Sequence, residues 1–224
     1  MHVCRSRGAR SKRVEGIYRV ARREERPALA TSERLLLWHG TRVSNLLGIL
    51  ATGLTASPSH ATITGRAFGD GLYFADVYDK SASYSHGSGD SELLLLCEVA
   101  MGKKLAVKEY SWGDQDKVVQ QAEKYDSLHV VGKHTPEEAG GVVTREGYTV
   151  PLGKVSKTEF KTKKNTWYGS GLDYSEYIVK DEARVNVRFI VKLGKGSEGQ
   201  AENMMNGDED GSEDSGEDSD SESG

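Results

Sequence analysis

Residues 35–41 constrain the fold of this chain more than any other segment, because an uninterrupted apolar run ends there abruptly in small and polar residues. Three leucines and a tryptophan in a row are typical of a strand that is buried on both faces. The strand ends in His39, Gly40 and Thr41, which would bring an imidazole, a bare backbone and a hydroxyl to one place. Taken alone, the trio is also what a strand ending in a turn beside a structural histidine would show.

A second segment, residues 69–84, adds polar side chains in a helical pattern. Residues 71–75 are predicted to form a short strand, and Asp76 suits the N-cap of the helix that would follow. Three side chains are expected to share one face of that helix because they are three and four residues apart: Lys80, Ser81 and Tyr84.

A third segment, residues 174–179, is predicted to be a strand that carries Glu176. Tyr174 stands two residues earlier and is expected to face the same side, because side chains alternate along a strand. Many predicted strands, two or three short helices and no alternating strand–helix rhythm indicate an α+β fold.

Together, in this order, the three segments resemble the catalytic domain of the poly(ADP-ribose) polymerase family over about residues 17–193. The resemblance implies an ADP-ribosyltransferase fold, with two packed, mainly antiparallel β-sheets and short flanking helices. It also implies NAD⁺ as co-substrate and no metal. The nicotinamide–ribose bond would be cleaved and ADP-ribose transferred to protein side chains or to a growing polymer. The alternatives are a mono-ADP-ribosyltransferase, or a catalytically weak module that binds NAD or ADP-ribose.

The resemblance assigns catalytic roles to four residues. Glu176 would accept a hydrogen bond from the nicotinamide-ribose 2′-hydroxyl and stabilise an oxocarbenium-like transition state, as carboxylates do in glycoside hydrolysis. Lys80 would lie near this glutamate. His39 would anchor the adenine-side ribose, and Tyr73 would close one wall of the nicotinamide pocket.

The resemblance also assigns the remaining co-substrate contacts. Gly40 would pair its backbone N–H and C=O with the nicotinamide carboxamide, and Ser81 would add a hydroxyl. Tyr84 would stack on the pyridinium ring, whose positive charge an aromatic face attracts. Thr41 would keep the hydroxyl of the serine that is frequent in the family. On the acceptor side the resemblance places Tyr174 and Ala67.

Three positions depart from the family pattern. Thr55 stands where an adenosine- or phosphate-side arginine is often found, and Arg66 stands where a tyrosine often lines the pocket. Ala67 replaces a bulkier residue. The last two leave polymer elongation open, while Glu176 keeps it possible.

The charges divide the chain into three parts. Residues 1–13 are predicted to be a basic disordered arm, either a nuclear-import or nucleic-acid-contacting patch or a solvated tail. Residues 14–194 would be the catalytic domain, without a helical regulatory domain, so activity is expected without DNA breaks. Residues 195–224 carry 11 acidic residues and one lysine and are predicted to be an acidic disordered tail.

The expected partners are acceptor proteins, including the chain itself, and basic chromatin proteins that the acidic tail would attract. Direct DNA binding is left open. No apolar run is long enough for a membrane span, so no membrane partner is expected. Two distant cysteines, Cys4 and Cys97, favour a reducing compartment. The nucleus is the expected location, and the cytoplasm is the alternative.

Overall fold

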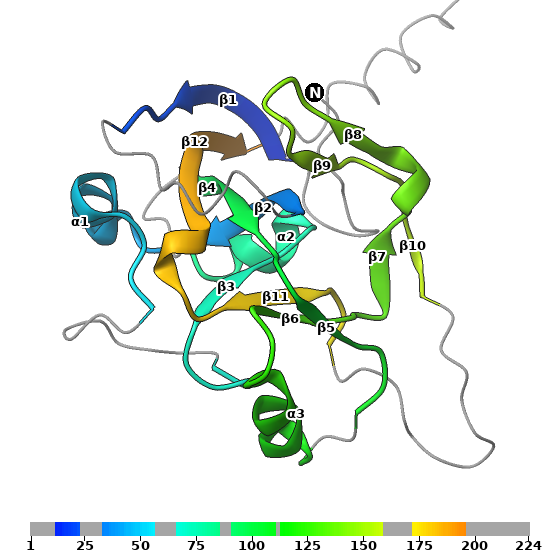
Figure 1. Ribbon diagram of the computed structural model, residues 1–224. Helices are drawn as coiled ribbons and strands as arrows, with labels where there is room; N and C mark the ends of the chain where they lie inside the picture. Colours follow the sequence, from blue (N-terminus) through cyan, green and yellow to red (C-terminus); the bar gives the residue numbers. More distant parts are fainter. Residues whose placement is uncertain are drawn as a thin grey trace, which may run out of the picture.

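The computed structural model describes residues 12–22, 33–56, 66–85, 91–110, 113–158 and 172–195. Two β-sheets with short helices around them make up most of these residues, as predicted for an α+β fold (Figure 1). A two-stranded sheet of β7 (His134–Pro136) and β10 (Val155–Lys157) was not expected.

The larger sheet has six strands in the order β1-β12-β4-β2-β9-β8. Its strands are β1 (Lys12–Arg19), β12 (Val185–Lys195), β4 (Ser91–Ala100), β2 (Arg34–Gly40), β9 (Thr149–Pro151) and β8 (Gly141–Val143). Every pair in this sheet is antiparallel except β2 with β9. The apolar strand β2 therefore lies inside the sheet, as its sequence predicts.

The smaller sheet has four strands in the order β3-β11-β6-β5. They are β3 (Leu72–Phe74), β11 (Glu176–Val179), β6 (Ser127–Val130) and β5 (Lys104–Val107). Here β5 and β6 run parallel and the other pairs are antiparallel. Because β11 is an inner strand, Glu176 belongs to the interior of this sheet rather than to its edge.

The two sheets share one hydrophobic core. Leu37 and Leu95 come from the larger sheet, and Phe74 and Tyr177 come from the smaller one. Cys97 is fully buried in the same core, where its side chain packs among apolar residues. Burial of so many apolar side chains supplies most of the free energy that holds the sheets together.

A backbone bridge joins the sheets next to the polar end of β2. The N–H of Trp38 donates to the carbonyl of Ala75 at 2.8 Å, and the N–H of Ala75 donates to the carbonyl of Trp38 at 2.9 Å. This pair of hydrogen bonds sets His39 against β3 and sets the chain after Ala75 on its course into the next helix.

That helix, α2 (Tyr78–Ala82), confirms the helix predicted after residue 76. The predicted cap is wrong, however, since Val77 is the N-cap and Asp76 is buried instead. The helix also ends earlier than expected. Tyr84 lies in a turn closed by its own N–H, which donates to the carbonyl of Ser81 at 3.1 Å. The three predicted polar side chains are thus not on one helical face.

The other helices are α1 (Leu46–Thr52) and α3 (Gln115–Ala122), and 3₁₀ turns cover Val43–Asn45, Glu138–Gly140 and Glu182–Arg184. Helix α3 packs Val118 and Ala122 against the four-stranded sheet, and Figure 1 shows it on the side away from the larger sheet. This helix was not predicted from the sequence, because few of its residues are apolar. Among the described residues, no helix has both the length and the apolar character needed to cross a membrane.

Strand β1 begins inside the segment predicted to be a basic arm. Lys12 pairs with Lys195 and Arg13 with Gly194, so these two residues extend the sheet instead of lying in an arm. Their basic side chains find acidic partners there; Lys12 Nζ donates to Glu92 Oε1 at 2.8 Å. Residues 1–11 and 196–224, to which the rest of both predicted tails belongs, lie outside the described residues.

Candidate active site

The close approach of Gly40 to helix α2 forms the first part of the site. A Cβ added to Gly40 would lie 1.8 Å from the carbonyl oxygen of Ser81 and 3.1 Å from Cβ of Tyr84. Only glycine allows the end of β2 to pack this tightly on the end of the helix. The structure therefore brings together three of the residues predicted to hold the nicotinamide.

His39 forms the second part. Its Nδ1 lies 2.9 Å from the carbonyl oxygen of Tyr73, and its ring centroid lies 5.5 Å from that of Phe74. Burial lowers the pKa of the imidazole, so the ring is neutral at physiological pH. Since a carbonyl can only accept, Nδ1 carries the proton and Nε2 is left as an acceptor. A sugar hydroxyl is a group that such a nitrogen can bind.

The ion pair between Lys80 and Glu176 forms the third part. Lys80 Nζ lies 2.7 Å from Glu176 Oε1, and the two side chains are 21% and 7% exposed. The second carboxylate oxygen, Oε2, is buried without a hydrogen-bond partner among the described residues. A buried carboxylate oxygen normally has a partner. The site thus holds a charged acceptor that a ligand hydroxyl could satisfy.

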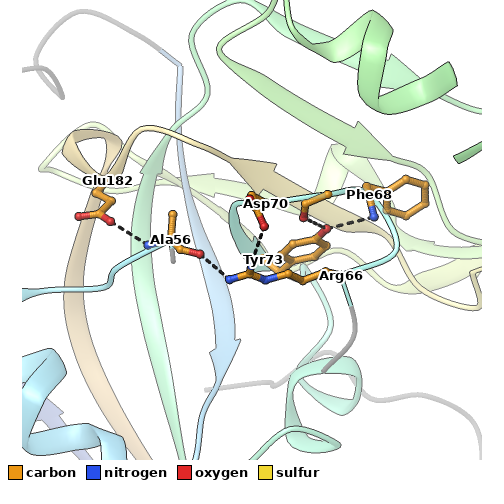
Figure 2. Close-up of polar contacts among 7 residues, drawn as sticks. Ala56, Arg66, Phe68, Asp70, Tyr73 and Glu182 are labelled. Carbon is orange, nitrogen blue, oxygen red and sulfur yellow. Dashed lines mark hydrogen bonds and ion pairs between the residues drawn. The ribbon is translucent and has the colours of Figure 1, made fainter. Parts of the chain in front are cut away.

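Tyr73 is bonded through its hydroxyl to the loop before β3. Its hydroxyl donates to the carbonyl of Gly69 at 2.7 Å and accepts from the N–H of Phe68 at 3.1 Å, as Figure 2 shows. Burial, aided by the negative charge of Glu176, raises the pKa of this phenol to about 12. Tyr73 is therefore held as a neutral side chain, with its backbone carbonyl on His39.

Arg66 braces the loops beside Tyr73. Its guanidinium pairs with Asp70 and donates to the carbonyl of Ala56 at 2.8 Å, while the N–H of Ala56 donates to Glu182 Oε1 at 2.8 Å (Figure 2). The tyrosine that the family pattern suggests at position 66 is thus replaced by a cation with two partners of its own.

The other three predicted residues have contacts of their own. Thr41 is buried and accepts a hydrogen bond from Asn45 Nδ2 at 3.1 Å. Tyr174 lies against His134, with ring centroids 6.1 Å apart, and Ala67 packs on the core beneath β6 and β11. None of these contacts is with Glu176.

A buried polar cluster behind Glu176 was missed from the sequence. Tyr177 donates from its hydroxyl to Asp76 Oδ2 at 3.2 Å, and the His129 ring stacks on Tyr177 at 4.1 Å between centroids. Burial raises the pKa of Asp76 to about 7 and lowers that of His129 to about 4. Asp76 stood out in the sequence only as a helix cap, and His129 carried no signal.

The arrangement brings the backbone of Gly40, a neutral imidazole and a buried carboxylate to the ends of β2, α2 and β11. Among the described residues, no three His, Cys, Asp or Glu side chains gather as metal ligands would.

Comparisons with known proteins match this chain to a family. A family model described as "Poly(ADP-ribose) polymerase catalytic domain" matches residues 4–195. Poly [ADP-ribose] polymerase 1 of Danio rerio is 36% identical over 186 residues, which is 80% of this chain and 17% of the relative. Poly [ADP-ribose] polymerase 2 of Homo sapiens is 41% identical over 162 residues, which is 71% of this chain and 26% of the relative.

A plant relative agrees. Poly [ADP-ribose] polymerase 2 of Zea mays is 38% identical over 166 residues, which is 73% of this chain and 24% of the relative. The chain thus spans only 17% to 26% of the length of these relatives. The family model covers all three polar segments, and the chain belongs to the poly(ADP-ribose) polymerase catalytic domain family.

Proposed function

We propose that this chain is an NAD⁺-dependent protein ADP-ribosyltransferase that builds poly(ADP-ribose). The observation that carries the proposal is the buried Glu176 carboxylate, which is paired on one oxygen with Lys80 and on the other has no hydrogen-bond partner within the described part of the chain. Such a group can accept a hydrogen bond from a ribose hydroxyl and stabilise the positive charge that develops as nicotinamide leaves.

The other residues would bind and orient the dinucleotide. The backbone of Gly40 offers an N–H and a C=O to the nicotinamide carboxamide, next to Ser81 and Tyr84. His39, neutral and with Nε2 as an acceptor, would receive a hydrogen bond from the adenine-side ribose. Holding both ends of NAD⁺ aligns the bond that breaks with Glu176.

The transfer step needs an acceptor that Glu176 can orient. When the acceptor is a ribose hydroxyl of bound polymer, the carboxylate would draw its proton and favour elongation. When it is a protein side chain, the product is a single ADP-ribose. Tyr174 and Ala67 are the residues proposed to border this acceptor.

Incubation with labelled NAD⁺ tests the proposal. The wild-type chain should release nicotinamide and label itself with a ladder of products, whereas Glu176→Ala should do neither. Glu176→Gln should retain some single transfer and lose most elongation, because an amide carries no charge. Equal labelling of the wild-type chain and Glu176→Ala would contradict the assignment.

The form of the product separates polymer synthesis from the alternative. One shifted band instead of a ladder would identify a mono-ADP-ribosyltransferase. The replacement of the expected pocket tyrosine by Arg66, which is engaged with Asp70 and Ala56, is the observation that favours this outcome.

The chain itself and other proteins are the acceptors we propose, and the nucleus is the proposed location. Binding of basic chromatin proteins is proposed for the acidic residues 195–224, most of which lie outside the described residues. Removal of residues 196–224 should abolish histone binding and leave nicotinamide release intact. Unchanged histone binding would remove this part of the proposal.

A further inference from the structure

Two side-chain contacts join the same two elements of the site. Lys80 of α2 meets Glu176 of β11 at 2.7 Å, and Asp76, just before α2, accepts the hydroxyl of Tyr177 at 3.2 Å. The proposed chemistry uses the first contact and leaves the second unexplained.

The two contacts lie on opposite faces of β11, because Glu176 and Tyr177 are neighbours in a strand. Tyr177 is paired with Phe74 and shares with it the core between the sheets. The Asp76 contact therefore holds the strand from its core side, while Lys80 holds the carboxylate on the other side.

The Asp76 carboxyl lies where burial disfavours its charged form. It is 3% exposed, and burial raises its pKa to about 7 although Tyr177, Ser175 and the backbone N–H of Val77 all favour its charged form. The ring stacked on Tyr177 from β6, His129, is neutral because its pKa is about 4, and Lys104 and Lys108 help to keep it so. The other charges that act on Tyr177 are those of Glu33 and Glu138.

We propose that Asp76 is a positioning residue that, through Tyr177, holds strand β11 so that Glu176 meets Lys80 and the substrate in one orientation. This inference rests on the proposed function. A hydrogen bond to a charged carboxylate is stronger than one to a neutral amide, so the charged acid fixes the strand better than any neutral replacement. A buried acid that lowers stability yet orders a functional strand is a feature expected of an active site.

The test is Asp76→Asn, which keeps an acceptor for Tyr177 and removes the charge. We expect kcat for nicotinamide release to fall about tenfold at pH 8 with KM changed less than about twofold. Wild-type kcat should decline as the pH falls through about 7, where Asp76 gains its proton. The variant should lack this decline. A fall in kcat smaller than about threefold, or a retained decline, overturns the inference.

The midpoint of thermal unfolding separates a positioning role from a purely structural one. If the Asp76 contact were purely structural, its loss would lower the midpoint. An acid whose pKa is raised on folding destabilises the folded state increasingly as the pH rises from its unfolded value to its folded value. Asp76→Asn should therefore raise the midpoint of thermal unfolding at pH 8 by roughly 5 °C, and by less at pH 5. A lower midpoint at pH 8 overturns the inference.

Tyr177→Phe tests the same link from its other end, and it should lower kcat as Asp76→Asn does. The double variant should show no further loss, and additive losses count against the link. Glu98→Gln is the matched control, because Glu98 is fully buried and pairs with Arg34 and Arg188 instead. It should lose stability while the folded protein keeps its kcat.

Failure of the proposed function gives a different result, namely no nicotinamide release by the wild-type chain. The coupling between Asp76 and Glu176 is then tested by the midpoints of thermal unfolding alone. Non-additive shifts of the unfolding midpoint for Asp76→Asn and Glu176→Gln support it, and additive shifts overturn it.

Discussion

Lys80 Nζ lies 2.7 Å from Oε1 of Glu176, although the two residues come from a short helix and a distant strand. Both side chains are largely withdrawn from solvent, so neither charge can be removed without affecting the other. This pair makes the stability of the site depend on the same atoms as its proposed chemistry.

The first prediction concerns this pair. Lys80→Met should destabilise the protein by about 3 kcal/mol, because it leaves a buried carboxylate without its cation. Lys80→Met combined with Glu176→Gln should recover most of that loss, since the unpaired charge is gone. Urea unfolding of the two single variants and the double variant measures the coupling, and additive losses would contradict it.

The second prediction concerns Gly40. Gly40→Ala should lower the free energy of unfolding by about 2 kcal/mol or more, because the added Cβ would lie 1.8 Å from the backbone oxygen of Ser81 and collide with it. It should also weaken nicotinamide binding, measured by calorimetry. Gly48→Ala is the control. Gly48 is exposed in α1, and an added Cβ would meet nothing within 4 Å. The free energy of unfolding of this variant should therefore rise by roughly 0.5 kcal/mol.

The third prediction concerns acid sensitivity. Since burial lowers the pKa of His129 to about 4, the folded state resists protonation that the unfolded chain accepts near pH 6.5. The contribution of the neutral ring to the free energy of unfolding, up to about 3 kcal/mol, is thus present above pH 6.5 and is lost as the pH falls toward 4.

His129→Phe keeps a ring against Tyr177 and should lose this acid sensitivity. The stability of this variant relative to the wild-type chain should therefore increase as the pH falls from 7 to 4.5. Urea unfolding at both pH values measures it. The exposed His134 offers a control, and His134→Phe should remain as acid-sensitive as the wild-type chain. Equal acid sensitivity in His129→Phe would contradict the prediction.

The fourth prediction concerns Tyr73. Tyr73→Phe removes a hydroxyl that bonds both Phe68 and Gly69, and it should cost about 2 kcal/mol because two backbone groups lose their partner. Tyr18→Phe, at an exposed tyrosine of β1, should change stability by less than about 0.5 kcal/mol. Thermal unfolding distinguishes the two variants, and equal effects would contradict a stabilising role for the hydrogen bonds of the Tyr73 hydroxyl.

Several local features were predictable because neighbouring residues encode them. The apolar run before His39 lies in strand β2, and Glu176 begins strand β11. The positive φ of Gly53, +94°, ends helix α1 at the position that its glycine suggests. Asn45 is the N-cap of that helix, and a 3₁₀ turn precedes it.

Other features were out of reach of local patterns. Helix α3 buries only Val118 and Ala122, too few apolar residues to produce a clear helical period. Asp76 has the composition of a helix cap, and only the fold shows that its partner is Tyr177, 101 residues away in the chain.

The sequence by itself determined the strands of the three polar segments, the polar residues that they carry and the family resemblance, because periodicity and motifs depend on residues close together in the chain. Only the tertiary structure decided which polar groups meet. Lys80 reaches Glu176, His39 reaches the Tyr73 carbonyl and Gly40 packs on Ser81 because two sheets close over one core. The burial that shifts the pKa values of Asp76 and His129 arises from the same closure, and no short segment contains it.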